Sequence, residues 1–102
     1  MKNGRNNLSE RLLNFAAEII KLTGHLNKTA AGRHIGLQLI RSSASAGANY
    51  EEACGAESRS DFIHKLQIVL KEVRESLYWL RLIGKSSLIQ AVHLAPLMQE
   101  AK

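Results

Sequence analysis

Residues 38–83 read QLIRSSASAGANYEEACGAESRSDFIHKLQIVLKEVRESLYWLRLI, and this stretch carries the strongest fold signal in the chain. In its second half, apolar residues recur at alternating steps of four and three, with Ser76 in the gap: Phe62, Leu66, Val69, Val73, Leu80 and Ile83. This rhythm is typical of a helix packed against its neighbours at a shallow angle. Ile63, Leu70 and Leu77 run beside the seam, so we expect a wider buried face than a two-stranded contact requires.

The first half of the stretch contains seven small residues in succession, from Ser42 to Ala48. A helix with only small side chains buries little area unless a neighbouring helix comes close. We therefore expect this segment to be a surface on which another helix packs closely. Gly32, Gly36 and Gly47 each cost roughly 1 kcal/mol of helix propensity relative to alanine. A close backbone approach is the expected compensation, and the two halves together predict an all-α bundle.

Capping signals predict four helices in one domain, residues 1–102, at about 8–23, 30–53, 60–83 and 88–102. Asn7 and Glu10 fit a capping box before the first helix, and Gly24 is suited to follow its end. Thr29 is a suitable N-cap for the second helix, and Gly55 for its end.

The third helix is predicted to begin at a serine N-cap, Ser58 or Ser60, and to end at Gly84. Ser86 or Ser87 is the candidate cap of the fourth helix. Pro96 either interrupts that helix and leaves it short, or lies in the first turn of a later one.

The composition excludes several protein classes. A single cysteine, Cys54, excludes an intramolecular disulfide and a Cys-rich zinc site, and it favours a reduced cytoplasmic location. The first residues contain no continuous apolar segment of the signal-peptide kind, and no apolar run is long enough for a membrane span. Asp61 and His64 offer one carboxylate and one imidazole but no second Glu-x-x-His set, so we expect no metal, no cofactor and no enzymatic activity.

The net charge of +5 lies entirely in the first 41 residues when charges are summed along the sequence. The basic residues there are Lys2, Arg5, Arg11, Lys21, Lys28, Arg33 and Arg41, against two glutamates. Such a patch attracts nucleic acid or an acidic protein surface. A solvated, solubilising face is the alternative interpretation.

A polar stripe is predicted along one face of the second helix, where Arg41, Ser45, Asn49 and Glu52 fall at helical spacing. One interpretation is a binding surface. The favoured one is a hydrogen-bonded network that sets helix register or a subunit contact, because partly buried polar groups must be paired.

The end of the third helix is apolar on nearly every side, and one bundle core covers only one face. Ile68, Tyr78, Trp79 and Leu82 therefore need a cover from the fourth helix or from a second subunit. Tyr78 and Trp79 are also able to stack on bases, although core or interface packing is the favoured role.

The stretch also carries a motif that runs from one helix, through a Ser/Arg-rich loop, into the next: Gln38, Arg41, Ser42, Ser45, Asn49, Glu52, Gly55, Ser58, Arg59, Ser60, Asp61 and Phe62. These residues resemble a four-helix-bundle family. It includes the proteins encoded by intervening sequences of bacterial large-subunit ribosomal RNA and the accessory variability determinants of diversity-generating retroelements. Ile40 and Ser42 occupy positions that are frequently basic in that family.

The resemblance implies an antiparallel up-down bundle that assembles as a ring-like homopentamer. It also implies, for the retroelement members, a basic surface that binds nucleic acid and a reverse transcriptase. The shared motif further implies a polar network of Gln38, Arg41, Ser45, Asn49 and Glu52. The ribosomal members have no settled biochemical role.

Two functions follow as expectations. The first is a non-enzymatic homo-oligomer that binds RNA or DNA weakly, or assists a reverse transcriptase, through Lys21, Lys28, Arg33, Arg41 and Arg59. The second is a protein-interaction or structural module without nucleic-acid binding.

Overall fold

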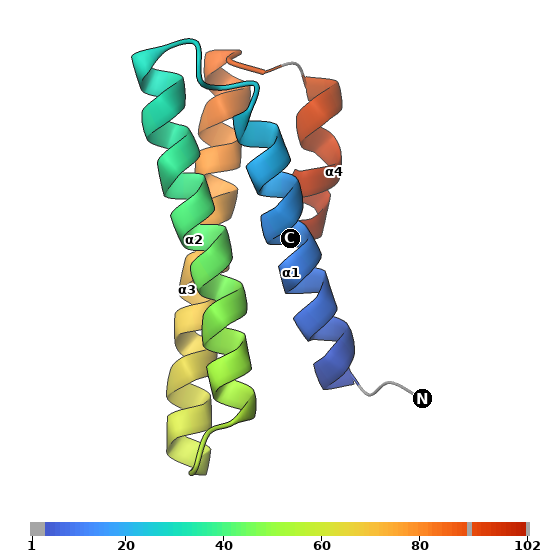
Figure 1. Ribbon diagram of the computed structural model, residues 1–102, viewed down its shortest axis with the longest axis vertical. Helices are drawn as coiled ribbons and strands as arrows, with labels where there is room; N and C mark the ends of the chain where they lie inside the picture. The colour runs from blue at the N-terminus through green and yellow to red at the C-terminus, as the bar shows by residue number, and fades with distance from the viewer. Residues whose placement is uncertain (1–3, 90, 102) are drawn as a thin grey trace.

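The computed structural model is a bundle of four helices (Figure 1). It describes residues 4–89 and 91–101, and side chains for residues 7–89 and 95–101. The helices are α1 (Gly4–Thr23), α2 (Ala30–Cys54), α3 (Arg59–Ser86) and α4 (Ala91–Ala101). Consecutive helices run antiparallel and pack against each other, and α4 closes the bundle against α1. The all-α bundle expected from the sequence is confirmed.

Serine and threonine side chains begin the two long helices as predicted. The Thr29 hydroxyl accepts a hydrogen bond from the backbone N–H of Gly32 at 3.0 Å and so caps α2. The Ser58 hydroxyl accepts one from the N–H of Asp61 at 3.1 Å, so Ser58 is the N-cap of α3. Each cap satisfies a donor that has no partner within the helix.

Two other boundary predictions are wrong. Helix α1 begins at Gly4, so Asn7 lies inside it and does not cap it; the capping-box pattern also fits an ordinary exposed first turn. Helix α3 continues through Gly84 to Ser86 and ends where Ser87 adopts a left-handed backbone with φ of 58°. An exposed last turn tolerates the propensity cost of Gly84.

The fourth helix is shorter than the predicted 88–102, and Lys102 lies outside the described residues. Pro96 sits inside α4, so the expectations that it interrupts the helix or occupies its first turn are wrong. The proline removes one backbone donor, but Ile89 and Leu97 are both buried in the core and hold the segment on either side of it.

The core has two parts along the bundle. The larger unites residues of all four helices and both upper connections: Phe15, Ile19, Leu22, Leu26, Ile35, Leu39, Leu80, Ile83, Ile89 and Leu97. The smaller lies toward the α2–α3 turn, where α4 ends, and contains Leu12, Ala46, Tyr50 and Val69; of α4, only Glu100 and Ala101 line the groove beside Leu12 and Val69. Figure 1 shows α4 covering only one half of the bundle.

The close-packing surface on α2 is confirmed for Ser42, Ser43 and Ala46, which are buried, but not for Ala44 and Ala48, which are exposed. The hydroxyl oxygens of Ser42 and Ser76 lie 2.7 Å apart and share a hydrogen bond, which explains the serine in the apolar seam of α3. Among the glycines, only Gly32 requires a close approach: a methyl group there would collide with the backbone carbonyl of Leu26.

The wider buried face predicted for α3 is wrong for two residues. The exposed fractions of Ile63 and Leu70 are 46% and 56%. Leu70 lines an open groove beside Leu8 and Leu12, on the side of the bundle that α4 covers only in part. The spacing of the apolar residues is the same along the whole of α3, but α4 lies beside only part of that helix.

Candidate functional site

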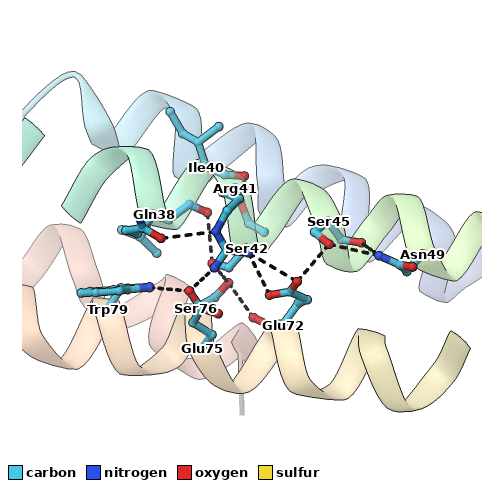
Figure 2. A network of polar contacts seen from close by, with 12 residues as sticks. Gln38, Ile40, Arg41, Ser42, Ser45, Asn49, Glu72, Glu75, Ser76 and Trp79 are labelled. Carbon is cyan, nitrogen blue, oxygen red and sulfur yellow. Dashed lines mark hydrogen bonds and ion pairs between the residues drawn. The ribbon is translucent and has the colours of Figure 1, made fainter. Parts of the chain in front are cut away.

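The guanidinium of Arg41 joins α2 to α3 in a polar network (Figure 2). Its Nη1 lies 3.3 Å from Oε1 of Glu72, and its Nη2 forms an ion pair with Glu75. Its Nε donates a hydrogen bond to Oε1 of Gln38 at 3.3 Å. One arginine of α2 therefore binds two carboxylates on successive turns of α3.

Glu72 is the buried member of the network, with only 8% of its side chain exposed. Its Oε2 accepts a hydrogen bond from the hydroxyl of Ser45 at 3.1 Å, and that hydroxyl accepts one from the amide of Asn49 at 3.0 Å. A buried carboxylate is tolerated when its charge and its lone pairs are both matched, and here Arg41 and Ser45 supply the matches.

The network shifts the pKa of its members. The hydrogen bond to Glu75 raises the pKa of Arg41 above its ordinary value. Hydrogen bonds from Arg41 and from the Trp79 indole lower the pKa of Glu75. Both residues therefore keep their charges across the neutral range.

Most of the predicted polar stripe comes together, but one member does not. Gln38, Arg41, Ser45 and Asn49 all belong to the network. Glu52 is 61% exposed and pairs with Lys65 at 2.8 Å instead, so its place in the network was predicted wrongly. The sequence analysis missed Glu72 and Glu75, although a polar pair beside Ser76 in an apolar seam is a signal of buried polar contacts.

The five predicted nucleic-acid contacts do not form one surface. Lys21 pairs with Glu18 at 3.6 Å, Lys28 is exposed in the α1–α2 connection, and Arg33 donates to the carbonyl of Asn27 at 3.1 Å. The last turn of α1, the connection and the first turn of α2 hold these three residues, and they lie at one end of the bundle (Figure 1).

The two remaining predicted contacts lie elsewhere. Arg59 begins α3 at the opposite end of the bundle from the α1–α2 connection (Figure 1). Arg41 is held between α2 and α3 by its ion pairs with Glu72 and Glu75.

A second basic surface follows the outer face of α3, and we call it the α3 stripe. Its seven members recur at steps of three and four, and all are exposed: His64, Gln67, Lys71, Arg74, Tyr78, Arg81 and Lys85. This spacing places them on one side of the helix. None is acidic, and within the described part of the chain none of its four cations makes an ion pair.

The net charge of a sequence segment does not predict this stripe, because that sum does not say which acids and bases lie next to each other in the folded protein. The second part of the chain is neutral in sum, but four of its seven acids form ion pairs with residues outside the stripe. Glu72 and Glu75 bind Arg41, Glu52 binds Lys65, and Glu100 binds Arg11 at 2.9 Å. The net charge of +5 does belong to the first 41 residues, but two of their arginines are neutralised by acids of the second part, which leaves cations on α3 without an ion pair among the described residues.

The predicted oligomer contacts on α3 are largely covered within the chain. Trp79 and Leu82 pack partly buried against the larger core, and Ile68 is half-buried. The Trp79 indole donates to Oε2 of Glu75 at 3.0 Å, and its ring lies 6.1 Å from that of His34. Helix α2 thus contributes His34 to the cover of Trp79, the larger core that Trp79 and Leu82 pack against includes residues of α4, and Tyr78 remains 58% exposed.

Two negative observations hold for the residues that the structure describes. No three or more His, Cys, Asp or Glu side chains there are grouped in a way that suits a metal ion. No described helix is both long enough and apolar enough to cross a membrane.

Comparison with known proteins identifies the family. Residues 6–102 match the family described as 23S rRNA-intervening sequence protein. The fold is also similar to the crystal structure of a protein of unknown function from the S23 ribosomal protein family of Bacteroides thetaiotaomicron VPI-5482. That match has a TM-score of 0.88 and 35% identity, and it covers 95% of this chain and 87% of the other. No curated protein matches. This chain belongs to the 23S rRNA-intervening sequence protein family.

Proposed function

We propose that this chain is a non-enzymatic, homo-oligomeric bundle protein that binds RNA or DNA weakly and with little sequence preference. The observation that carries the proposal is the α3 stripe, an exposed row of four cations, none of which forms an ion pair with a described residue, although Glu75 lies one turn from Lys71. Cations of this kind attract phosphates regardless of base sequence.

The α3 stripe is long enough to contact several phosphates along the backbone of one nucleic-acid strand. Lys71 and Lys85 are separated by fourteen residues of α3, which span about 21 Å at 1.5 Å per residue. Because the cations stand on a regular helix, their relative positions are fixed before binding. Several phosphates along one strand are therefore within reach of one subunit.

Assembly would multiply this surface. We expect the ring-like homopentamer implied by the family resemblance, in which each subunit adds one stripe. A multivalent basic surface binds a flexible polyanion more tightly than one stripe does. A reverse transcriptase that works on the same nucleic acid is the protein partner that the resemblance adds.

Salt-titrated binding tests the proposal. Labelled RNA and DNA oligonucleotides are titrated with the oligomer at several salt concentrations, and log Kd should rise linearly with log salt. Charge reversal of Lys71, Arg74 and Arg81 to glutamate should abolish binding. The matched control reverses Lys21, Lys28 and Arg33, which changes the same number of charges at the end of the bundle.

Two results would overturn the proposal in different ways. Loss of binding only in the control variant would move the site to the α1–α2 end. No detectable binding at low salt would remove the nucleic-acid function altogether.

The alternative function, a protein-interaction module, is favoured by a different face. Leu13, Ile20 and Leu37 are 63%, 55% and 67% exposed, and they line grooves between α1 and α2. A protein partner would bury this face. Charge reversal of Lys71, Arg74 and Arg81 leaves this face intact, so a variant that loses nucleic-acid binding but keeps a protein partner would separate the two functions.

A further inference from the structure

Tyr78 is the aromatic member of the α3 stripe, at the centre of its cations. It follows Arg74 by four residues and precedes Arg81 by three, so both guanidinium groups stand on neighbouring turns of the same face. Its exposed fraction is 58%, so more than half of its surface is available for a ligand. The sequence analysis weighed base stacking here against packing, and packing within the chain does not cover this ring.

The ring of Tyr78 is supported from behind. It meets the Trp79 ring edge-on, with centroids 5.1 Å apart and planes at 72°. Trp79 in turn is held by its hydrogen bond to Glu75 and by the ring of His34. Since Glu75 is paired with Arg41, the polar network in Figure 2 fixes the support of the exposed ring.

We propose that Tyr78 is a stacking platform for an unpaired base, so that the α3 stripe prefers single-stranded nucleic acid to duplex. The inference rests on the proposed nucleic-acid function and specifies its ligand. In a duplex the base faces are already stacked and unavailable. In a single strand, one base stacks on Tyr78 while the phosphates on either side meet Arg74 and Arg81.

A second copy of the chain is a poorer occupant of this surface. Covering Tyr78 with protein would also desolvate Arg74, Arg81 and Lys85, for which the stripe offers no carboxylate. The same stripe on the second copy would repel it. A strand of phosphates supplies the missing negative charge, whereas its bases supply the flat apolar surface.

The experiment compares Tyr78→Leu and Tyr78→Phe with the unchanged protein. The probes are a labelled single-stranded oligothymidine and a hairpin duplex with the same number of phosphates, at one low salt concentration. Leu8→Ala, which removes an exposed apolar side chain from α1, is the control away from the stripe.

We expect the unchanged protein to bind the single strand more tightly than the duplex. Tyr78→Leu should weaken single-strand binding by roughly 5- to 100-fold and bring it to the duplex level, because stacking of one base is lost. Tyr78→Phe should retain the preference, and the slope with salt should not change, because no phosphate contact is removed.

The outcomes separate this inference from the function on which it rests. Salt-dependent binding that is equal for both probes and unaffected by Tyr78→Leu would overturn the stacking role and leave the stripe as a phosphate surface. Failure to bind either probe would instead overturn the proposed function. A change in oligomer mass for Tyr78→Leu, measured by light scattering, would assign Tyr78 to a subunit contact and reject the inference.

Discussion

Glu72 and Glu52 show how burial decides what a glutamate does in this protein. Both pair with a cation, but 8% of the Glu72 side chain is exposed against 61% of Glu52. An exposed pair gains little, because water already solvates both charges. A buried carboxylate cannot lose its partners without leaving groups unsatisfied, so the two residues have different mutational costs.

Glu72→Ala should lower the free energy of unfolding by about 1–3 kcal/mol, since it leaves the Ser45 hydroxyl without its acceptor and removes one of the two carboxylates that pair with Arg41. Glu52→Ala should cost about 0–1 kcal/mol, because its pair is exposed. Urea melts of the two variants provide the comparison. Equal midpoints would mean that the buried network contributes nothing to stability.

Glu75 predicts how stability depends on pH. Its pKa is lowered from 4.5 in the folded protein, by the hydrogen bond from Arg41 first and that from Trp79 second. A carboxylate with a lowered folded pKa stabilises the protein above its unfolded pKa, and this contribution disappears as the pH falls through the folded value. Stability should therefore decline below about pH 4.5, and Glu75→Gln should reduce the decline. A parallel decline in the variant would contradict this assignment.

Among the elements, α2 is the helix with two different faces. Ala46 is fully buried against the smaller core, whereas Ala44 is exposed only two residues earlier. The small residues keep α2 close to its neighbours on one side, and on the other they leave an open surface. The same residue type therefore has a packing role or none, according to its position around the helix.

Ala46→Leu should overpack the contact and destabilise the bundle by about 1–3 kcal/mol. Ala44→Leu adds the same atoms on the solvent side of α2 and should change stability by less than about 0.5 kcal/mol. Thermal melts of both variants test this difference. If Ala46→Leu melts like the parent, the α2 surface is not closely packed.

The elements also show what sequence reasoning can reach. The caps Thr29 and Ser58 and the small face of α2 were predictable because they depend on residues close in sequence or on a repeated spacing. The α3 stripe was not, because it became visible only after Glu72 and Glu75 were assigned to Arg41. Ile63 and Leu70 were misjudged because their exposure depends on where α4 lies.

For the bundle as a unit, self-association is the main expectation. A single chain leaves Leu13, Ile20 and Leu37 exposed between α1 and α2, and such apolar surface usually marks a contact. Light scattering should therefore give a mass several times 11.3 kDa, and five copies is the specific expectation. Leu13→Glu with Leu37→Glu should lower the mass while helicity is retained. A clean monomer of the unchanged protein at micromolar concentration would exclude assembly.

The incomplete reach of α4 has a consequence for how the protein opens. Along its 44 Å length the bundle changes from four helices with a large core to three helices with a small one. Local opening costs less where fewer apolar contacts must be broken. Amide hydrogens beside the α2–α3 turn should therefore exchange with deuterium sooner than those near the α1–α2 connection. Unfolding of this chain then begins at the end with the α2–α3 turn, and the opposite end stays folded longest.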